Sequence, residues 1–350
     1  MTYIPELYKQ SSYMFDLPEV LIATYPCEPR DAARLLVINR NDGTLREEVF
    51  SGIKNYLEAG DTLVVNETKV IPARLFGKKS TGAKAEILLL KQIDAHTWEA
   101  LVKPARRLKK GDWLSFSGSA VTARITSKLH LEGGRQIEFH NCDRWEHFLE
   151  SHGHIPLPPY IKRADEHSDR GSYQTVYART SGSVAAPTAG LHFTRNLLQE
   201  LQNREVNIAA VLLHAGLGTF RPVSCNDIRD HRMHREYFEV SQDVADLLNQ
   251  TRKRGNRVMG VGTTVARTLE SIYDKKNGYK AGSGETGIYI YPGYSFQSLD
   301  AMITNFHLPG SSLLMLASAF GGVALVREAY AYAITNSFRF YSYGDAMLIL

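Results

Sequence analysis

The segment Gly260-Val261-Gly262-Thr263-Thr264 joins an apolar run at 257–261 to an amphipathic stretch at 264–273. A strand that ends in glycine and threonine before a helix directs backbone N–H groups toward a ligand. Two other polar junctions follow apolar runs: Ala186-Pro187-Thr188-Ala189-Gly190-Leu191-His192-Phe193 and Thr304-Asn305-Phe306-His307-Leu308-Pro309. Together the three junctions predict one composite pocket at the strand ends of an open α/β sheet, and an enzyme with a small polar substrate or cofactor.

A change in the residue pattern marks a second domain within the chain. Between Ile71 and Asn141, short runs rich in Val, Ile, Leu and Thr alternate with Gly, Ser and Lys, without a helical period. This pattern is typical of a small barrel. We therefore predict an α/β fold in which a large mixed-sheet α/β domain, residues 1–68 and 152–350, carries an inserted small all-β, barrel-like domain at 69–151.

Several local elements of the large domain can also be predicted. Thr194 and Ser241 each precede a stretch with leucine or valine at helical spacing, and each is a good N-cap. Residues 275–287 are rich in glycine and lysine, so we expect a mobile connection there. The apolar run at 288–291 predicts a strand.

The composition excludes several classes of protein. The chain has 350 residues, 43% hydrophobic and 22% charged, as in ordinary soluble globular proteins. The most apolar stretch, 311–320, is too short to span a bilayer, and the N-terminus lacks the pattern of a signal peptide. Three widely spaced cysteines predict neither a disulfide framework nor a CxxC metal site. We expect a cytoplasmic protein without a membrane partner.

Positive charge is concentrated locally, although the net charge is only +4. The segment 103–110 holds five cations and no acid: Lys103, Arg106, Arg107, Lys109 and Lys110. A second cluster lies at 252–257. Each cluster alone fits a solvated loop or a helix end. Two clusters beside a polar pocket favour a polyanionic partner.

Three histidines occupy comparable places in the predicted topology. His192, His214 and His307 each lie at the mouth of a strand or loop among small residues. Any one of them could be a buried structural histidine, but their shared placement makes them candidates for proton transfer. The pair of histidines in 231–236 lacks the further ligands that a metal site requires, so we predict no metal.

Two aspartates also lie beside strand-like runs. A buried carboxylate at Asp300 or Asp345 could read the N1–H and amine of a guanine-like base. A turn aspartate explains each of them equally well.

Taken together, these segments resemble the S-adenosylmethionine:tRNA ribosyltransferase-isomerases of queuosine synthesis. The matching stretches are 15–18, 71–77, 155–161, 173–177, 184–193, 213–223, 231–236, 260–271, 304–309 and 340–347. They cover nearly the whole chain. The fold of that family is a large α/β domain with an inserted β-barrel, which agrees with the change in residue pattern described above.

The resemblance implies a tRNA-modifying transferase and isomerase. S-adenosylmethionine donates its ribosyl moiety to 7-aminomethyl-7-deazaguanine at the wobble position of tRNA, which gives epoxyqueuosine and releases adenine and methionine. The reaction needs a base, a proton donor for adenine and exclusion of water. It implies no metal and no redox cofactor. The implied partners are S-adenosylmethionine and the tRNA, with no obligate protein partner, and we expect a monomer.

The resemblance also suggests roles for individual residues. His192, His214 and His307 become candidates for the proton transfers, in an order that stays open. Thr263, Thr264 and Arg267 would hold the methionine carboxylate or the ribose, while Phe220 and Phe306 would stack on adenine or the flipped base. The full predicted substrate-binding set is Thr188, Gly190, Thr219, Phe220, Gly262, Thr263, Thr264, Arg267, Asp300, Asn305, Phe306 and Asp345. The cations of 103–110 would lie along the phosphates of the anticodon stem.

Two other functions remain open at this stage. An S-adenosylmethionine-dependent RNA methyltransferase would use the same donor, but its glycine-rich turn would be expected after an early strand. A non-catalytic RNA-binding module would use the all-β insert, but it leaves the three polar junctions without a purpose.

Overall fold

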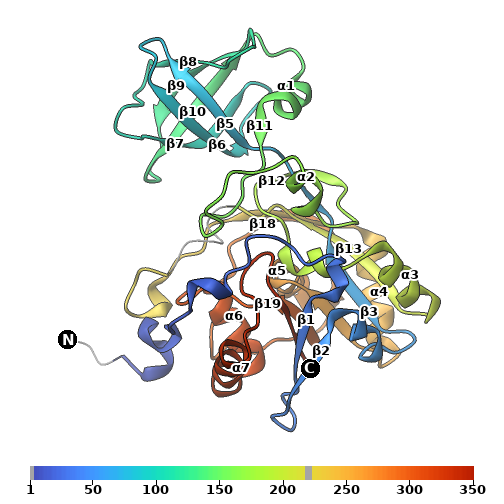
Figure 1. The fold of residues 1–350 in the computed structure, drawn as a ribbon. Coiled ribbons are helices and arrows are strands. Elements are labelled where there is room, and N and C mark those ends of the chain that lie inside the picture. Colours follow the sequence, from blue (N-terminus) through green and yellow to red (C-terminus); the bar gives the residue numbers. More distant parts are fainter. Residues whose placement is uncertain (1–3, 217–222) are drawn as a thin grey trace.

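The computed structural model describes residues 4–216 and 223–350. Figure 1 shows a β-barrel standing above a larger α/β body, with the first and last strands of the chain side by side in that body. The predicted α/β fold with an inserted barrel is confirmed.

A nine-stranded mixed sheet forms the centre of the α/β body. Its strands, in spatial order, are β18 (Gly282–Thr286), β14 (Glu236–Val240), β13 (Asn207–Leu213), β3 (Thr62–Asn66), β15 (Val258–Val261), β19 (Ala301–Asn305), β20 (Ala346–Ile349), β1 (Arg34–Ile38) and β2 (Leu45–Val49). The four strands from β13 to β19 are parallel to one another, and β20 pairs antiparallel with β19. The carboxyl ends of four strands therefore meet at one edge, beside the start of β20.

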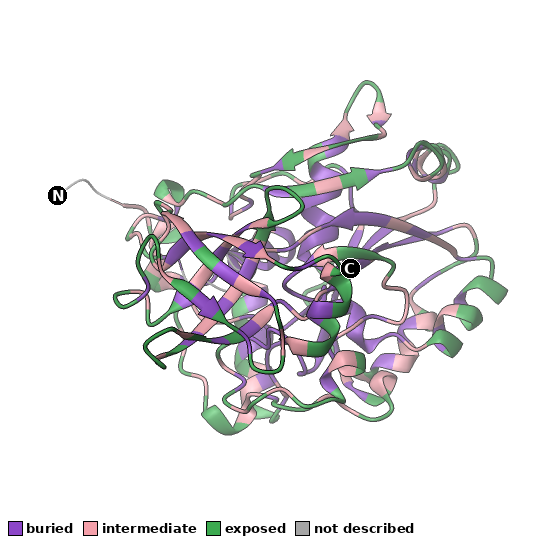
Figure 2. Ribbon diagram, turned by 90° about the horizontal axis from the view of Figure 1, so that it is seen from above, coloured by how far each residue is buried: buried purple, intermediate pink, exposed green. Residues whose placement is uncertain are grey.

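Helices cover both faces of this sheet. α4 (Gln242–Lys253), α5 (Thr263–Ile272), α6 (Ser312–Gly321) and α7 (Val323–Thr335) cover one face, and α3 (Arg195–Asn203) with the 3₁₀ helix η5 (Phe50–Asn55) covers the other. Alternate residues of each strand face the two layers: Leu36 packs with the first group and Leu35 with the second. The central strands are accordingly buried throughout (Figure 2).

The helix caps predicted from the sequence are present. Thr194 accepts a hydrogen bond from the Leu197 N–H over 3.1 Å at the start of α3. Ser241 accepts one from the Val244 N–H over 3.4 Å at the start of α4. Each cap satisfies a backbone donor that the first helical turn leaves unpaired.

Six antiparallel strands close the barrel. They are β5 (Arg74–Lys79), β6 (Lys84–Gln92), β7 (Thr97–Lys103), β10 (Gly134–His140), β9 (Thr122–Lys128) and β8 (Trp113–Ser115), and pairing of β5 with β8 completes the circle. β11 (Gly153–His154) pairs antiparallel with the start of β5. α1 (Trp145–His152) covers one end of the barrel, where Trp145 stacks on Trp98 and Phe148 packs edge-on against Phe116.

Short elements complete the chain. β4 (Thr68–Val70) pairs parallel with β12 (Thr180–Ser183), β16 (Tyr273–Asp274) pairs with β17 (Gly278–Tyr279), and α2 (Asp169–Ser172) lies in the return from the barrel. Further 3₁₀ helices are η1 (Glu6–Tyr8), η2 (Gln10–Tyr13), η3 (Glu19–Leu21), η4 (Arg30–Ala32), η6 (Thr188–His192) and η8 (Ile228–Asp230). An ion pair of 3.1 Å between Lys91 and Glu285 joins the barrel to the sheet edge.

Two predictions for the region after α5 are wrong. Residues 275–287 contain β17 and β18, and the strand predicted at 288–291 is absent from these described residues. β18 is glycine-rich, but its backbone pairs along its whole length with β14, and this pairing outweighs the weak strand propensity of glycine. None of the described helices is by itself long and apolar enough to cross a membrane; α6 and α7 reach that length only together and meet at 115°.

Candidate functional site

The three polar junctions predicted from the sequence converge on one cavity at the carboxyl edge of the sheet. Its lining is formed by Ala185, Ala186, Pro187, Thr188, Ala189, Ala215, Gly262, Thr263, Thr264, Thr304, Asn305, His307 and Leu313. Six predicted site residues are among them: Thr188, Gly262, Thr263, Thr264, Asn305 and His307. The cavity between the described residues is about 40 Å³. Pockets for small organic ligands hold roughly 300–1,000 Å³, so a nucleoside can enter only if these segments move apart.

The turn between β15 and α5 aims the start of a helix at this cavity. Gly262 has φ of +90°, a conformation that suits glycine, and its N–H donates to the Ile303 carbonyl over 2.7 Å. Thr263 and Thr264 form the first turn of α5, where backbone N–H groups have no partner within the helix. The positive end of the helix dipole favours an anion such as a carboxylate at this place.

Asn66, the last residue of β3, and Thr68, the first residue of β4, connect this turn with the end of β13. The Asn66 side-chain amide donates to the Leu213 carbonyl over 2.9 Å and to Oγ1 of Thr264 over 3.2 Å. Thr68 Oγ1 lies 2.8 Å from Nδ1 of His214. Sequence analysis did not select Asn66 or Thr68 as site residues. Both residues lie at the carboxyl end of a buried strand, as the residues of the three junctions do, and this position could have identified them.

His192 and His307 meet neighbouring residues at the end of β19. Nε2 of His192 lies 3.1 Å from the Asn305 amide nitrogen, and Nε2 of His307 lies 2.7 Å from Thr304 Oγ1. Burial lowers the pKa of His307 to about 3, and burial together with the cations Arg339 and Arg30 lowers the pKa of His192 to about 3. Both rings are therefore neutral at pH 7.

His214 has a different environment. It is partly exposed and lies against Gly182, where an added Cβ would stand 2.7 Å from Nε2 of the histidine. Burial lowers the pKa of His214, while the carboxylate of Glu239 opposes that shift. The ring is outside the cavity lining, but the next residue, Ala215, belongs to it.

Comparisons with known proteins show which family the sequence belongs to. The sequence matches the family described as queuosine biosynthesis protein over residues 10–349. It is 54% identical over 346 residues to an S-adenosylmethionine:tRNA ribosyltransferase-isomerase of Syntrophomonas wolfei, covering 99% of this chain and 98% of that one. A protein of the same name from Staphylococcus haemolyticus is 52% identical over 337 residues, covering 96% and 98%.

A solved structure extends the likeness to the fold. The crystal structure of an S-adenosylmethionine tRNA ribosyltransferase from Thermotoga maritima is 36% identical, with a TM-score of 0.56, and the match covers 97% of this chain and 100% of that one. This chain belongs to the queuosine biosynthesis protein family. The resemblance inferred from the sequence is thereby confirmed.

Two residues predicted to contact the ligand lie outside the cavity lining. Phe306 is fully buried and packs against Phe338 and Phe340, so it presents no face to a ligand. Asp300 precedes β19 and therefore lies at the opposite edge of the sheet from the cavity. Its carboxylate accepts a hydrogen bond from the Val258 N–H over 2.7 Å and pairs with Arg252 at 2.8 Å.

Two further predicted residues lie on the correct side of the sheet but already have protein partners. Asp345 is buried and accepts hydrogen bonds from the backbone N–H groups of Arg34 and Arg339, over 3.0 and 2.7 Å. Arg267 forms a buried ion pair with Glu236, whose other oxygen accepts from the Gly216 N–H over 2.9 Å. The geometry assigns both residues to holding the walls of the site rather than to a ligand.

Gly190 has a packing explanation. A Cβ at this position would lie 2.0 Å from the hydroxyl oxygen of Tyr177. Gly190, predicted to contact substrate, is absent from the cavity lining, and the close approach of a buried tyrosine accounts for the glycine. Thr219 and Phe220, also predicted to contact substrate, lie outside the described residues.

The predicted tRNA-binding cations lie together on the barrel. Lys103 ends β7, and Arg106, Arg107, Lys109 and Lys110 are exposed in the loop that follows. This loop is held from inside by Arg135, a buried residue that sequence analysis did not select. Its guanidinium donates to the carbonyl oxygens of Ala105 and Leu108 over 2.6 and 2.8 Å. Throughout 4–216 and 223–350, no group of three or more His, Cys, Asp or Glu residues is placed to hold a metal ion.

Proposed function

We propose that this chain is an S-adenosylmethionine:tRNA ribosyltransferase-isomerase of queuosine biosynthesis. It transfers the ribosyl moiety of S-adenosylmethionine to 7-aminomethyl-7-deazaguanine at the wobble position of tRNA and isomerises it to epoxyqueuosine, with release of adenine and methionine. The observation that carries the proposal is the convergence of all three polar junctions on one cavity, in a chain more than half identical to enzymes of that name.

The site offers distinct places for the parts of the donor. The N-terminal turn of α5, with Thr263 and Thr264, suits the methionine carboxylate. The buried imidazole of His307, which lines the cavity, is neutral and suits a hydrogen bond to a ribosyl hydroxyl. The small volume of the cavity supports exclusion of water once the donor is enclosed.

We propose His214 as the base that removes the proton made acidic by the sulfonium. An efficient general base has a pKa near the working pH, and pKa values of about 3 disfavour His192 and His307 for that role. His214 is only partly buried, and Thr68 orients its ring. S-adenosylmethionine supplies its own leaving group and the overall change is redox-neutral, so the proposal includes no metal and no redox cofactor.

The remaining features of the proposal concern its setting. The substrate is a tRNA, so we propose that the enzyme acts in the cytoplasm, free of membranes. We propose a monomer without an obligate protein partner. The molar mass in solution, measured by light scattering with and without tRNA, tests this part.

Product analysis tests the function directly. The protein is incubated with S-adenosylmethionine and tRNA carrying 7-aminomethyl-7-deazaguanine, and the released small molecules are identified. Adenine and methionine together support ribosyl transfer. S-adenosylhomocysteine would identify a methyltransferase, and bound tRNA without turnover would identify a binding module. His214→Gln should slow adenine release by about 10²–10⁴-fold, whereas the matched change at the exposed His130 should leave it unaltered.

A further inference from the structure

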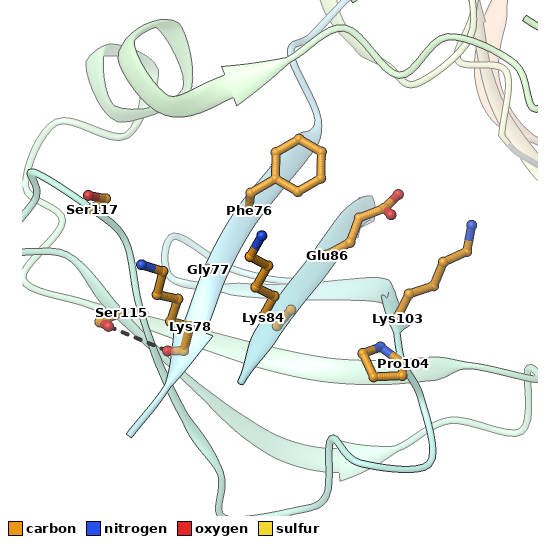
Figure 3. A pocket seen from close by; sticks show the side chains of 10 residues that line it. Phe76, Gly77, Lys78, Lys84, Glu86, Lys103, Pro104, Ser115 and Ser117 are labelled. Carbon is orange, nitrogen blue, oxygen red and sulfur yellow. Dashed lines mark hydrogen bonds between the residues drawn. The ribbon is translucent and has the colours of Figure 1, made fainter. Parts of the chain in front are cut away.

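A groove of about 790 Å³ lies on the outer face of the barrel. Figure 3 shows its lining, which comes from β5, β6, the end of β7 and the region of β8. The lining residues are Phe76, Gly77, Lys78, Lys84, Ala85, Glu86, Lys103, Pro104, Ser115 and Ser117. The proposed reaction at the sheet edge does not use this groove.

The groove has an unusual excess of positive charge. Lys78 and Lys84 are directly opposite each other on adjacent antiparallel strands, and both are exposed. Like charges in that arrangement destabilise a sheet. Lys103 stands opposite Glu86, but Glu86 pairs with Arg74 at 3.4 Å. In the described parts of the chain, none of the three lysines has an acidic partner.

An exposed aromatic ring lies among these cations. Phe76 is 53% exposed, and its ring is supported edge-on by His154 at 4.9 Å between centroids. In Figure 3 it stands at one end of the groove, with Lys84 next to it and Lys78 farther along the same strand. Proteins that bind single-stranded nucleic acid combine these two elements, a face on which a base stacks and cations that follow the backbone.

We propose that this groove binds an unpaired nucleotide of the tRNA, with its base stacked on Phe76 and its flanking phosphates against Lys78, Lys84 and Lys103. The choice of tRNA as the RNA rests on the proposed function. Continuity of charge favours RNA over an acidic peptide. Lys103 leads directly into the exposed cations of 106–110, so the positive charge of the groove continues along the chain into the loop.

Binding of labelled tRNA at several salt concentrations, measured by fluorescence anisotropy, tests the groove. Phe76→Ala should weaken binding about tenfold or more, the effect of losing one stacked base. Trp113→Ala, at another exposed aromatic of the barrel, is the matched control and should bind as the unchanged protein does. Phe76→Leu keeps an apolar side chain without a π-face and should also lose affinity.

The lysines have a separate readout. Changing both Lys78 and Lys84 to Gln should reduce the slope of log affinity against log salt by about 2. The matched change at Lys128, an exposed lysine of β9 outside the groove, should leave the slope unchanged. The affinity for S-adenosylmethionine should stay constant in all variants.

The groove and the proposed function fail in different ways. Equal tRNA affinities for the Phe76 and Trp113 variants, or an unchanged salt slope for the lysine pair, would overturn the groove even if the protein releases adenine. Conversely, a protein that releases no adenine but loses RNA affinity through Phe76 would retain the groove and lose the proposed reaction. If Phe76→Ala lost affinity only for duplex RNA and not for RNA with unpaired nucleotides, stacking of an unpaired base on Phe76 would be overturned.

Discussion

The side-chain amide of Asn305 donates a hydrogen bond to Nε2 of His192 over 3.1 Å, while its own carbonyl oxygen has no partner among the described residues. The hydrogen bond places the proton of the neutral imidazole on Nδ1. A buried oxygen without a donor costs about 1–3 kcal/mol. Because Asn305 lines the cavity, a substrate hydroxyl that donated to this oxygen would recover that energy.

Asn305→Asp should therefore reduce the rate of adenine release by at least about tenfold, the size of one lost hydrogen bond at a charged or buried site. The carboxylate cannot donate to His192, and its charge raises the pKa of that imidazole. Steady-state rates at saturating S-adenosylmethionine measure the effect. Asn203→Asp, on the exposed surface of α3, is the control, and equal rates for the two variants would remove Asn305 from the mechanism.

Stability should fall as the pH drops below about 6.5. His192 and His307 have folded-state pKa values of about 3, below the value of 6.5 in an unfolded chain, so the unfolded state binds more protons between these limits. Each histidine then lowers the free energy of unfolding by up to about 1.4 kcal/mol per pH unit. Urea unfolding at pH 7 and pH 5 measures this, and His307→Gln should reduce the pH dependence. An equal dependence in that variant would contradict the neutral burial of His307.

Gly190→Ala should destabilise the protein because the new Cβ would meet the hydroxyl of Tyr177 at 2.0 Å. Overpacking of this kind costs about 1–3 kcal/mol. Tyr177→Phe should be tolerated, since the Tyr177 hydroxyl is buried and has no partner in the described part of the chain. Combined, the two changes should recover part of the lost stability. Additive effects in thermal unfolding would show that the two positions are not coupled.

Replacement of Arg135, which holds the basic loop from inside, should weaken tRNA binding although this buried residue contacts no phosphate itself. Arg135→Met keeps the buried stem but loses the hydrogen bonds to Ala105 and Leu108. The loop then samples more conformations, and tRNA affinity should fall several-fold while S-adenosylmethionine affinity stays constant. Lys109→Glu with Lys110→Glu should weaken the same binding through charge alone. If only the charge variant has an effect, ordering of the loop is unimportant.

The sequence contained enough information for the architecture because the relevant patterns are local. Short β runs without a helical period mark the barrel, and Thr194 marks a helix start through one side-chain hydrogen bond. The convergence of the three junctions was also predictable, since the carboxyl ends of parallel strands share an edge.

The errors came from properties that depend on neighbours distant in sequence. Asp300 is the exception, because it directly precedes β19 and the direction of the chain alone places it at the opposite edge of the sheet from the cavity. The direction in which Phe306 points depends on a core built from residues near 338. The strand β18 exists because β14 offers it a partner, and its own glycines give no sign of that.

The arrangement of β1 and β20 has a consequence for how the molecule is made. These two strands lie side by side, and Asp345 caps their edge by accepting from the Arg34 N–H, a contact across 311 positions. A nascent chain leaving the ribosome can complete the barrel early, but β1 and β2 must wait for β20 before they join the sheet. The two outermost strands on this side of the sheet are thus added after the residues that line the cavity, 185–313, have all been made.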